Sequence, residues 1–411
     1  MIGGGAAGII AAWRAASIGA SVVILEKTVR LGTKILISGG GKCNITHDGP
    51  IEDVLKAFRA NEARFLRPSF YRFQAHELVK LLTDRGLEVY TRPDGRIFPV
   101  HQNAKDVVAI LRQLLDEVGV QVRFECPVQE ILTSEGRVTG LRTPGGILKT
   151  SKVVLCVGGS SYPNSGTTGD GWPWMKQLGH TIVPLRAALA PIYIALESES
   201  PSGLSLRDVI LKARLGTKEI DRWRGDMLFT HQGLSGPCAL GISRNVAEKS
   251  LEGPVAMSVD LLPDRTFDQL LADLVADAVA HPHRSVGNHL GILFPDRVVE
   301  LVLKAAGGSE GTRLKDWDRK SRNRVVETLK SLPLGMVRAV PLEKGEVVAG
   351  GVSLNEVNPQ TMESRNIYGA FLCGEILDIA GPVGGYNLQA AWSTGFVAGE
   401  TAAMQALSRV E

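Results

Sequence analysis

The chain opens with a hydrophobic pattern that predicts a helix followed by a strand. Residues 6–18 are rich in alanine and end at Gly19, which predicts a helix with a glycine at its C-terminal end. The next segment, SVVILE (21–26), is a short β-branched run that ends in an acid and is typical of a buried strand. Only Met1 and Ile2 stand before the first glycines. A buried strand usually has about 5–6 residues, so we expect the native chain to begin a few residues upstream.

The segments that follow predict a mixture of helices and short strands. Residues 51–85 have a helical pattern, and residues 103–118 carry apolar side chains at helical spacing. Between them, residues 87–100 predict two short strands joined by a Pro-Asp-Gly turn. Residues 120–159 predict several strands with glycine turns, and the last of these, KVVLCVGG (152–159), has the apolar run of a buried strand.

The hydrophobic pattern changes near residue 188. Residues 189–260 predict mainly strands with frequent turns, and residues 265–335 predict charged helices. A glycine-rich, strand-like pattern returns at residue 347 and continues through residues 367–400. A Rossmann-type α/β domain is therefore predicted to open and close the chain, with an insertion between its two parts.

Composition and charge exclude several classes of protein. The chain has 411 residues, of which 44% are hydrophobic and 22% are charged, as in an ordinary globular protein. The net charge of +3 is too small to predict nucleic acid or an acidic membrane as the main partner. No apolar run approaches the ~20 residues that cross a bilayer. The five cysteines are scattered without a C-x-x-C pair, which argues against a disulfide framework or zinc ribbon and favours a cytoplasmic protein.

The first glycines have the spacing of a dinucleotide-binding loop, although glycines also mark ordinary tight turns. Gly3, Gly5 and Gly8 satisfy G-x-G-x-x-G ahead of the predicted helix. In this motif the first glycine makes the turn, the second lets a pyrophosphate approach the backbone, and the third lets the helix pack on the strand. Glu26 lies 18 residues after Gly8 (26 − 8), close to the ~20 expected for the acid that binds ribose. The candidate nucleotide-binding residues are Gly3, Gly5, Ala6, Ala7, Gly8, Glu26 and Lys27.

Two further segments favour FAD over NAD. The strand 152–159 ends in a pair of glycines, like the strand-to-glycine segment that recurs in two-dinucleotide flavoproteins. FLCGEILD (371–378) places an acid after another buried strand, where acids commonly lie near the ribityl chain and pyrophosphate. A helix is predicted from about residue 386, and its positive dipole end would suit the N1–C2=O edge of a reduced, anionic flavin. The candidate residues here are Gly158, Gly159, Gly374, Glu375, Asp378, Gly385, Tyr386, Asn387 and Leu388.

The segment LISGGGKCNITHDG (36–49) could be a phosphate loop, a redox cysteine site or a flexible turn. A Walker A loop needs a glycine where the chain has Leu36 and a serine or threonine where it has Cys43, so an NTPase is excluded. A disulfide-reducing flavoenzyme needs a second cysteine close to Cys43 in the sequence, and there is none. We therefore interpret Cys43 as a small residue packed against a cofactor, with a catalytic thiol as the alternative.

Four stretches together resemble the BaiN-type, aminoacetone-oxidase-like family of FAD-dependent oxidoreductases. They are RLGTKILISGGGKCNITH (30–47), VVLCVGGSSYPNSGTTGDGW (153–172), LFTHQGLSGP (228–237) and TMESRNIYGAFLCGEILDIAGPVGGYNLQAAWSTG (361–395). The resemblance implies an α/β fold with a Rossmann-like FAD domain, three-layered as in glutathione reductase, that is interrupted by a β-barrel-like and a helical subdomain. The implied boundaries are 1–187 and 341–411 for the FAD domain, 188–262 and 326–340 for the barrel, and 263–325 for the helices.

The family pattern, carried onto this sequence, implies that the glycine-rich segment lines the FAD. The implied residues are Lys34, Ser38, Gly39, Gly40, Gly41, Lys42, Cys43 and Asn44. The glycines would let backbone N–H groups approach the flavin ring or the pyrophosphate, and Val128 would hold the adenine through its backbone. Two positions depart from the family, because Lys42 replaces the usual arginine and His47 replaces the usual asparagine. Lys42 keeps the positive charge that offsets the cofactor's negative charge, but it loses the bidentate geometry of arginine.

Histidines are the remaining candidates for catalysis or metal binding. His231, in LFTHQGLSGP, is the best acid/base candidate because histidine titrates near neutral pH, and the alternative is a hydrogen-bonded histidine that supports the turn. His281, His283 and His289 have no carboxylate or cysteine at matching spacing, so no metal is predicted and a solvent-exposed loop is expected. Tyr386 could donate to a substrate, but we favour capping of the flavin edge.

The sequence therefore predicts an FAD-dependent oxidoreductase that transfers hydride between flavin N5 and a small-molecule substrate, NAD(P)H, or both. Only one dinucleotide fingerprint is found, so NAD(P)H would bind transiently. One alternative is an FAD-containing binding or regulatory protein without turnover. Another is an RNA-modifying flavoprotein, which is disfavoured because the basic run 313–324 alternates with Asp316 and Asp318, as on a solvated helix face.

Overall fold

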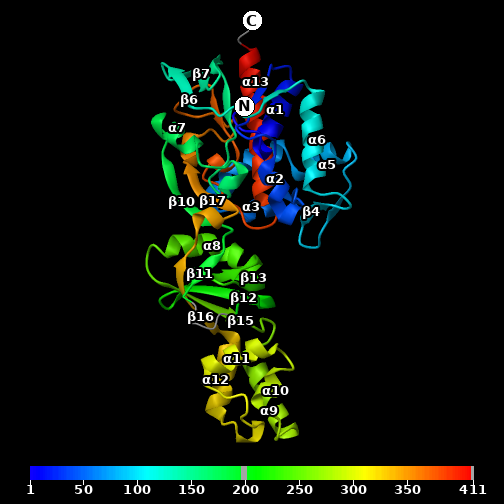
Figure 1. Cartoon of the computed structure of the whole chain (residues 1–411), viewed down its shortest axis with the longest axis vertical. Helices are drawn as coiled ribbons and strands as arrows, with labels where there is room; N and C mark the ends of the chain where they lie inside the picture. Colours follow the sequence, from blue (N-terminus) through cyan, green and yellow to red (C-terminus); the bar gives the residue numbers. More distant parts are fainter. Residues whose placement is uncertain (196–200, 409–411) are drawn as a thin grey trace. The chain divides into compact units, whose positions relative to one another are not determined.

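The computed structural model describes residues 1–195 and 201–408. The chain folds into two compact units: Met1–Arg186 together with Gly345–Glu411, and Ala187–Lys344 (Figure 1). The first unit thus contains both ends of the chain, as the predicted α/β domain requires. The predicted division of the chain into an FAD domain, a barrel and a helical subdomain, with the boundaries given above, stays a prediction.

The first unit is built around a parallel sheet. Strand β1 (Val23–Leu25) pairs with β5 (Gln121–Arg123), and β9 (Val153–Leu155) pairs with β18 (Ala370–Leu372). Ile2 forms parallel bridges to both β1 and β9, so the order across the sheet is β5, β1, Ile2, β9, β18. The predicted strand after the first glycine loop is therefore confirmed, and before the loop Ile2 alone bridges to the sheet.

Helices and antiparallel strands cover this sheet. The other elements are α1 (Ala6–Ser17), α2 (Thr33–Ile37), β2 (Thr46–His47), α3 (Ile51–Lys56), α4 (Ala60–Arg72), α5 (Ala75–Thr83), β3 (Val89–Thr91), β4 (Arg96–Pro99), α6 (Ala104–Glu117), β6 (Glu130–Ser134), β7 (Arg137–Thr143), β8 (Gly146–Lys149), α7 (Gly171–Gln177), β10 (Ile182–Ala188), β17 (Val347–Val352) and α13 (Tyr386–Leu407). Figure 1 shows α1, α13 and α6 on one side of the unit and β6 and β7 on the other. The predicted three-layer α/β fold is confirmed, and the helical pattern at 51–85 is divided into three helices.

Helices α1 and α13 run side by side in the same direction. A β-carbon at Gly395 would lie 2.4 Å from the carbonyl oxygen of Ala7, and one at Gly399 would lie 2.1 Å from that of Ala11. The two contacts advance by four residues on both helices, so the helices are parallel and their backbones touch. Since α13 has nine residues before Gly395 and α1 has one before Ala7, α13 begins about 12 Å before α1 at 1.5 Å per residue.

The second unit is a closed barrel with a helical insertion. In barrel order its strands are β11 (Ile192–Ile194), β14 (Gly233–Ser235), β13 (Lys218–Phe229), β12 (Ser205–Leu215), β15 (Val255–Asp260) and β16 (Leu332–Ala339). Between β15 and β16 lie α9 (Phe267–Ala280), α10 (Val286–Leu290), α11 (Asp296–Ala306) and α12 (Arg319–Lys330). The predicted barrel and helical regions are confirmed, although α8 (Pro237–Lys249) is a helix inside the segment that was predicted to be mainly β.

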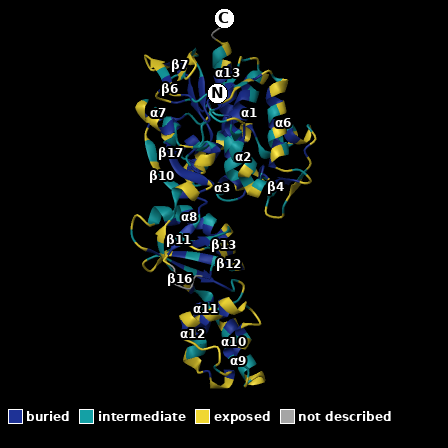
Figure 2. Ribbon diagram, in the orientation of Figure 1, coloured by how far each residue is buried: buried dark blue, intermediate teal, exposed yellow. Residues whose placement is uncertain are grey.

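Each unit has its own hydrophobic core (Figure 2). In the first unit, Ile24 and Trp392 are fully buried among α1, β1, α6 and α13. In the second, barrel residues such as Leu211 and helical residues such as Val302 belong to one cluster, so the barrel and its helical insertion share a core. Within the described residues, no helix combines the length and the apolar character needed to cross a membrane.

His180 gives the stability of the first unit a pH dependence. Its imidazole is buried, with Nδ1 3.1 Å from Glu356 Oε2 and Nε2 2.8 Å from Ser364 Oγ. Burial lowers the pKa of His180, and the nearby Glu356 carboxylate opposes this only in part. As the pH falls below about 6.5, the histidine of the unfolded chain is protonated while His180 of the folded chain stays neutral. The free energy of unfolding therefore decreases as the pH falls from that value toward the folded-state pKa.

We expect His180→Gln to reduce the loss of unfolding free energy between about pH 7.5 and 5.5, because glutamine does not titrate. Urea unfolding of both proteins at the two pH values measures this difference, and contributions from other titrating groups are common to both. An equal loss in the two proteins would contradict the assignment to His180.

Candidate functional site

The three glycines of the first loop occupy the places that their predicted roles require. Gly3 has a φ of 95°, and a β-carbon at Gly8 would lie 2.0 Å from Gly3 O. Gly5 faces open space, since an added β-carbon would meet no atom within 4 Å. The N–H groups of Ala6, Ala7 and Gly8 have no acceptor in the described part of the chain. Free backbone donors therefore border an open space at the start of α1, which suits a phosphate.

Glu26 follows β1 directly, and Val128 lies in the segment between β5 and β6. The buried Glu26 carboxylate accepts from the N–H groups of Gly4 (2.7 Å) and Thr28 (2.8 Å). The backbone carbonyl of Glu26 accepts from Cys126 N at 2.9 Å. Because Cys126 is only two residues before Val128, this bond brings the segment that contains Val128 next to Glu26. Val128 is buried, yet its N–H and C=O have no hydrogen-bond partner between residues 1 and 195 or 201 and 408. Buried main-chain groups need partners, so this position suits a bound base.

The loop after β9 returns to the loop after β1. Lys27 Nζ bonds to Thr168 Oγ1 and pairs with Asp170. Burial raises the pKa of Asp170, but the hydrogen bonds from Lys27 and Thr168 outweigh it and lower the pKa. Gly158 has a φ of 71°, and a β-carbon there would lie 2.9 Å from Thr167 Cγ2. The ammonium group of Lys27 therefore pairs with Asp170, and this ion pair holds the loop after β9 against the loop after β1.

Lys34, on α2, meets Glu375 across the fold. Lys34 Nζ donates to Glu375 Oε2 (2.6 Å) and to Ser161 Oγ (2.7 Å). The other carboxylate oxygen, Oε1, accepts from Val348 N at 2.8 Å. Gly159 lies against the same carboxylate, because a β-carbon there would be 3.0 Å from Glu375 Cδ. Two predicted residues 341 positions apart therefore form one ion pair beside the second glycine loop.

The loop after β18 lies against the start of α1. Gly374 N donates to Thr394 Oγ1 at 3.0 Å, and a β-carbon at Gly374 would lie 3.1 Å from Ala7 Cβ. Asp378 Oδ1 instead accepts from Gly350 N at 2.9 Å. The Asp378 carboxylate thus binds the backbone of β17, and its role at the cofactor stays a prediction.

The glycine-rich segment forms a left-handed turn. Gly39, Gly40 and Gly41 have φ angles of 57°, 67° and 85°, which glycine adopts readily and other residues seldom do. A β-carbon at Gly40 would meet no atom within 4 Å, and Lys42 is exposed. The positive φ angles therefore explain why glycine stands at these three positions. At Gly40 there is also an open space where a side chain would project.

Cys43 continues this turn with a φ of 60°, and its side chain is buried. Burial raises the pKa of the thiol to about 11, and a hydrogen bond with Ser38 opposes this only in part. Ser38 Oγ also donates to Ile35 O at 2.8 Å. A protonated, buried thiol is a poor nucleophile, which supports the interpretation of Cys43 as a packing residue.

We expect Cys43→Ser to retain FAD. Serine has nearly the same size, so the turn keeps its shape, while burial of the hydroxyl costs about 1 kcal/mol of stability. Flavin absorbance per purified chain measures FAD retention, and urea unfolding measures the cost. A colourless Cys43→Ser protein would show that the thiol itself is needed at the cofactor.

The start of α13 is tied to the glycine turn and to β2. The amide of Asn44, in the orientation that satisfies both of its groups, accepts from Gly385 N (2.9 Å) and donates to Thr46 O (3.2 Å). A second set of N–H groups has no acceptor in the described residues: those of Tyr386, Asn387 and Leu388. Both α1 and α13 therefore begin with free N–H donors. These two helix starts are about 12 Å apart along the helix axes at 1.5 Å per residue.

Several contacts of the site could not be predicted because they join positions that are far apart in the sequence. His47 was noted only as a departure from the family, yet its Nε2 lies 3.0 Å from Tyr386 Oη. Ser161, inside one of the family-like stretches, joins the Lys34–Glu375 pair. Cys156 and Cys373 are free, buried thiols whose sulfurs lie 3.3 Å apart, 217 positions from one another in sequence.

His231 lies in the second unit, exposed in the turn between β13 and β14. The turn is held by Thr230 N, which donates to Gly233 O at 2.7 Å. The His231 ring makes no hydrogen bond to any residue that the structure describes. The alternative interpretation, a histidine that supports the turn by hydrogen bonding, is therefore wrong, and the acid/base role stays a prediction.

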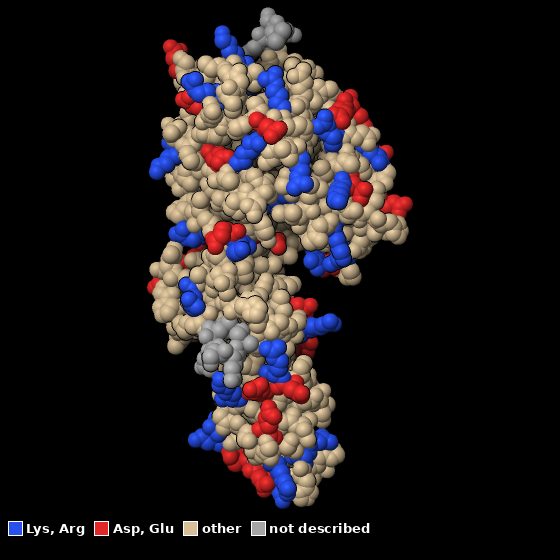
Figure 3. All heavy atoms as spheres, in the orientation of Figure 1, with Lys and Arg blue, Asp and Glu red and all other residues tan. Residues whose placement is uncertain are grey.

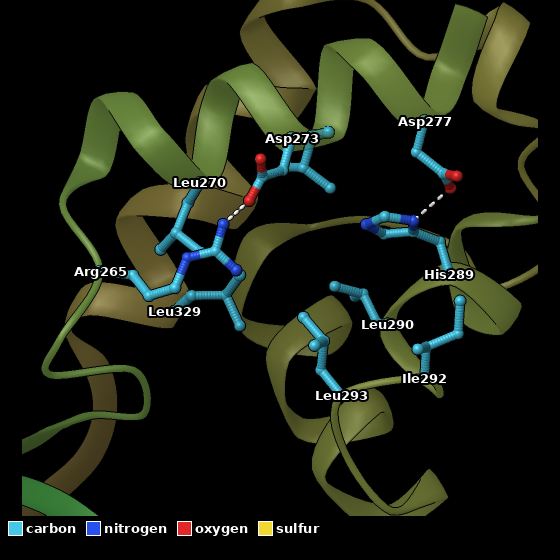
Figure 4. A pocket seen from close by; sticks show the side chains of 10 residues that line it. Arg265, Leu270, Asp273, Asp277, His289, Leu290, Ile292, Leu293 and Leu329 are labelled. Atoms are coloured by element: carbon cyan, nitrogen blue, oxygen red, sulfur yellow. Dashed lines mark hydrogen bonds and ion pairs between the residues drawn. The ribbon is translucent and has the colours of Figure 1, made fainter. Parts of the chain in front are cut away.

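The expectation of an exposed loop is wrong for His289. This residue lies on α10 with 12% of its side chain exposed, and its Nδ1 is bonded to Asp277 (Figure 4). Burial raises the pKa of Asp277, but His289 and Arg284 outweigh it and lower the pKa. The His289 ring borders a cavity of about 240 Å³ with leucines of α9 and α10. Among the described residues, no group of three or more His, Cys, Asp or Glu could hold a metal.

The residues of the first unit fit FAD. The free donors at the start of α1 suit the pyrophosphate, the Glu26 and Val128 end suits the adenosine, and the glycine turn with the start of α13 suits the flavin ring. Fold and site together define an FAD-dependent oxidoreductase.

Comparison with known proteins identifies the family. The model of the HI0933-like protein Rossmann domain matches residues 1–401, so the chain belongs to this family. The chain is 30% identical over 407 residues to the 3-dehydro-bile acid delta(4,6)-reductase of Clostridium scindens, with 98% of both chains covered. It is also 30% identical over 398 residues to the ribosomal RNA dihydrouridine synthase of Escherichia coli, with 96% of this chain and 95% of the relative covered.

Solved structures agree on the fold. The 3-ketosteroid delta1-dehydrogenase from Sterolibacterium denitrificans superposes with a TM-score of 0.54 at 15% identity, covering 98% of both chains. A quinol-fumarate reductase with menaquinol molecules gives 0.52 at 18% identity, covering 100% of this chain and 71% of the other. At these identities the likeness shows the fold alone. The predicted family and its Rossmann-like FAD fold are confirmed.

Proposed function

We propose that the chain is an FAD-dependent reductase of a carbon–carbon double bond conjugated to a carbonyl group. The observation that carries this proposal is the start of α13, whose free N–H groups and attached glycine turn would border one end of the flavin ring. A helix dipole and Lys42 would stabilise negative charge there, which suits a cofactor that is reduced and reoxidised. When bound, FAD supplies hydride transfer at N5, and the protein supplies binding, orientation and protons.

The cofactor would lie extended between the two helix starts. Glu26 would accept hydrogen bonds from the adenosine ribose, and the backbone of Val128 would bind the adenine. The donors beside Gly5 would bind the pyrophosphate, and Glu375 would lie near the ribityl chain. The turn formed by residues 38–44 would lie against the flavin ring. The unpaired donors and open β-carbon positions of these residues support this placement.

The names of the two relatives share one kind of chemistry. Double bonds at positions 4 and 6 of a 3-oxo steroid skeleton are conjugated to its carbonyl group, and dihydrouridine is uridine saturated at the C5–C6 bond, which is conjugated to the C4 carbonyl. In each case hydride adds to the carbon of the double bond that is farther from the carbonyl group, and a proton adds to the nearer carbon. The chain is 30% identical to each relative, so the shared chemistry rather than either substrate is what the likeness supports.

We further propose that NAD(P)H reduces the bound FAD in a transient complex. The chain has one G-x-G-x-x-G fingerprint, and we assign it to FAD because the open space beside Gly5 and the close contacts at Gly3 and Gly8 support a pyrophosphate there. A second dinucleotide would then bind only while hydride is transferred. This proposal predicts saturable bleaching of the flavin by NADPH or NADH.

A small molecule is proposed as the substrate in preference to RNA. Figure 3 shows basic and acidic side chains interspersed over the face drawn, whereas RNA binding relies on basic surfaces that contact phosphates. The basic run on α12 follows Asp318, which caps the helix by accepting from Ser321 N at 2.9 Å. The E. coli relative nevertheless makes ribosomal RNA the second candidate.

Product analysis tests the substrate class. The FAD-loaded protein would be incubated with NADPH and, separately, 2-methylcyclohex-2-enone, a 3-oxo-Δ4 steroid, uridine and protein-free ribosomal RNA. We expect mass spectrometry to show two added hydrogen atoms in one of the two unsaturated ketones. Saturation of uridines in RNA alone would establish the second candidate, and no saturated product from any substrate would favour the binding or regulatory alternative.

A further inference from the structure

We propose that the phenol of Tyr386 donates the proton in this reduction and that His47 resupplies it, an inference that rests on the proposed function. Tyr386 Oη lies 3.0 Å from His47 Nε2, and the two rings stack with centroids 4.3 Å apart at 22°. Tyr386 is the first residue of α13, where the free N–H groups lie. Saturation of a conjugated double bond takes one hydride and one proton, so a proton donor is needed beside the cofactor.

The surroundings hold both rings in place. A β-carbon at Gly384 would lie 2.8 Å from Tyr386 Cε2, and one at Gly95 would lie 2.5 Å from His47 Nε2. Phe58 packs edge-on against Tyr386, with ring centroids 6.0 Å apart at 86°. Glycine at both positions therefore makes room for the pair, and a third aromatic ring packs against one side.

The hydrogen bonds of His47 set a direction for the proton. Its Nδ1 lies 2.9 Å from Gly384 O, a carbonyl that can only accept, so Nδ1 carries a hydrogen. Nε2 is then the atom that exchanges a proton with Tyr386 Oη. When the imidazole is protonated, Nε2 donates to Oη and leaves the phenol hydrogen free for a substrate.

The state of Tyr386 suits a donor. Burial raises the pKa of its phenol, and the negative charge of Asp94 raises it further, so the phenol is protonated at neutral pH. Tyr386 is only half-buried, which leaves it within reach of a substrate. His47 is also only half-buried, which leaves it within reach of solvent.

The proton transfer completes the reduction. NAD(P)H is the reductant, and FAD, when bound, would supply the hydride. As hydride adds to the β-carbon, the π electrons move to the α-carbon and carbonyl oxygen as an enolate. The O–H bond of Tyr386 breaks as a C–H bond forms at the α-carbon. The Nε2–H bond of protonated His47 breaks as the phenol re-forms, and the neutral imidazole then takes a proton from water.

Tyr386→Phe separates this role from binding, because it removes only the hydroxyl. We expect NADPH to reduce the flavin at a rate within about twofold of wild type, while reoxidation by 2-methylcyclohex-2-enone slows at least about 100-fold, the usual range for a lost general acid. Reoxidation by 1-nitrocyclohexene should change only a few-fold, since its nitronate product is stable and is protonated in water. Tyr71→Phe is the matched control, because Tyr71 Oη donates to exposed Glu52 at 2.8 Å.

Two readouts do not depend on rate. Wild type should give one enantiomer of 2-methylcyclohexanone, and Tyr386→Phe should give a nearly racemic product because water protonates either face of the enolate. With ¹³Cζ-tyrosine in the FAD-loaded protein, which has six tyrosines, the resonance missing in Tyr386→Phe identifies Tyr386. That resonance should shift in His47→Ala, and added imidazole should partly restore the reoxidation rate of this variant.

These experiments can separately overturn the role of Tyr386, the role of His47 and the proposed function. Equal losses with the enone and the nitroalkene, or an unchanged enantiomer ratio in Tyr386→Phe, would overturn the proton-donor role. A Tyr386 resonance that does not move in His47→Ala would overturn the role of His47. A wild-type protein that accepts electrons from NADPH but passes them neither to the two probes nor to the 3-oxo-Δ4 steroid would contradict the proposed function itself, and the proton-donor role would fall with it.

Discussion

Valine in place of Gly5 is expected to give a folded protein that has lost its FAD. Gly5 has a φ of −82° and a ψ of −167°, an extended conformation that valine adopts, and no atom lies within 4 Å of its added β-carbon. The fold therefore accepts the side chain. In the holoprotein the same side chain would stand where the pyrophosphate approaches the start of α1. We expect FAD affinity to fall at least about 100-fold, which is about 2.7 kcal/mol.

Titration of FAD into the flavin-stripped protein measures this loss, and far-UV circular dichroism measures the fold. Gly311→Val is the matched control, because its β-carbon also meets no atom within 4 Å and it lies in the second unit. A folded Gly5→Val protein with normal FAD affinity would refute the placement of the pyrophosphate. A Gly5→Val protein that fails to fold would refute the assignment of open space at this position.

Valine in place of Gly399 is expected to destabilise the first unit by about 3 kcal/mol, the upper part of the usual range for overpacking. A β-carbon there would lie 2.1 Å from Ala11 O and 2.7 Å from Ala11 C, and backbone atoms cannot move aside as a side chain can. Helix propensity alone predicts the opposite sign, since glycine is the poorer helix former. The separation of α1 and α13 would also disturb both helix starts, so FAD affinity should fall.

Urea unfolding monitored by tryptophan fluorescence checks this prediction. Met404→Val is the control on the same helix, because Met404 is 52% exposed and surface substitutions usually change stability by less than about 0.5 kcal/mol. A Gly399→Val protein as stable as this control would show that the backbones of α1 and α13 are not in contact.

Much of the cofactor site could be predicted from the sequence because its residues act through the backbone. The spacing of Gly3, Gly5 and Gly8 assigns a turn, an open approach and a close packing contact, and the structure shows these three environments in the same order. Glycine has no side chain, so its roles depend on local chain geometry that a short motif specifies. The helix starts at Ala6 and Tyr386 follow from the same kind of local signal.

The remaining contacts could not be predicted because they depend on how distant segments pack. The ion pair of Lys34 with Glu375 joins two ends of the chain, and so does the pair of His47 with Tyr386. Lys27 and Asp378 were predicted by position next to a motif, yet their charged groups bind Asp170 and the backbone of β17. Charged side chains are long and can turn toward several neighbours, so position in sequence does not determine their partners.

An anaerobic spectral titration of the purified protein decides whether it is an FAD-dependent enone reductase. We predict that the protein carries FAD, that NADPH or NADH bleaches its flavin band, and that a conjugated enone added in excess restores the band while it is converted to the saturated ketone. A protein that takes up no FAD, or whose bound flavin is bleached by neither nicotinamide nucleotide, would contradict the account.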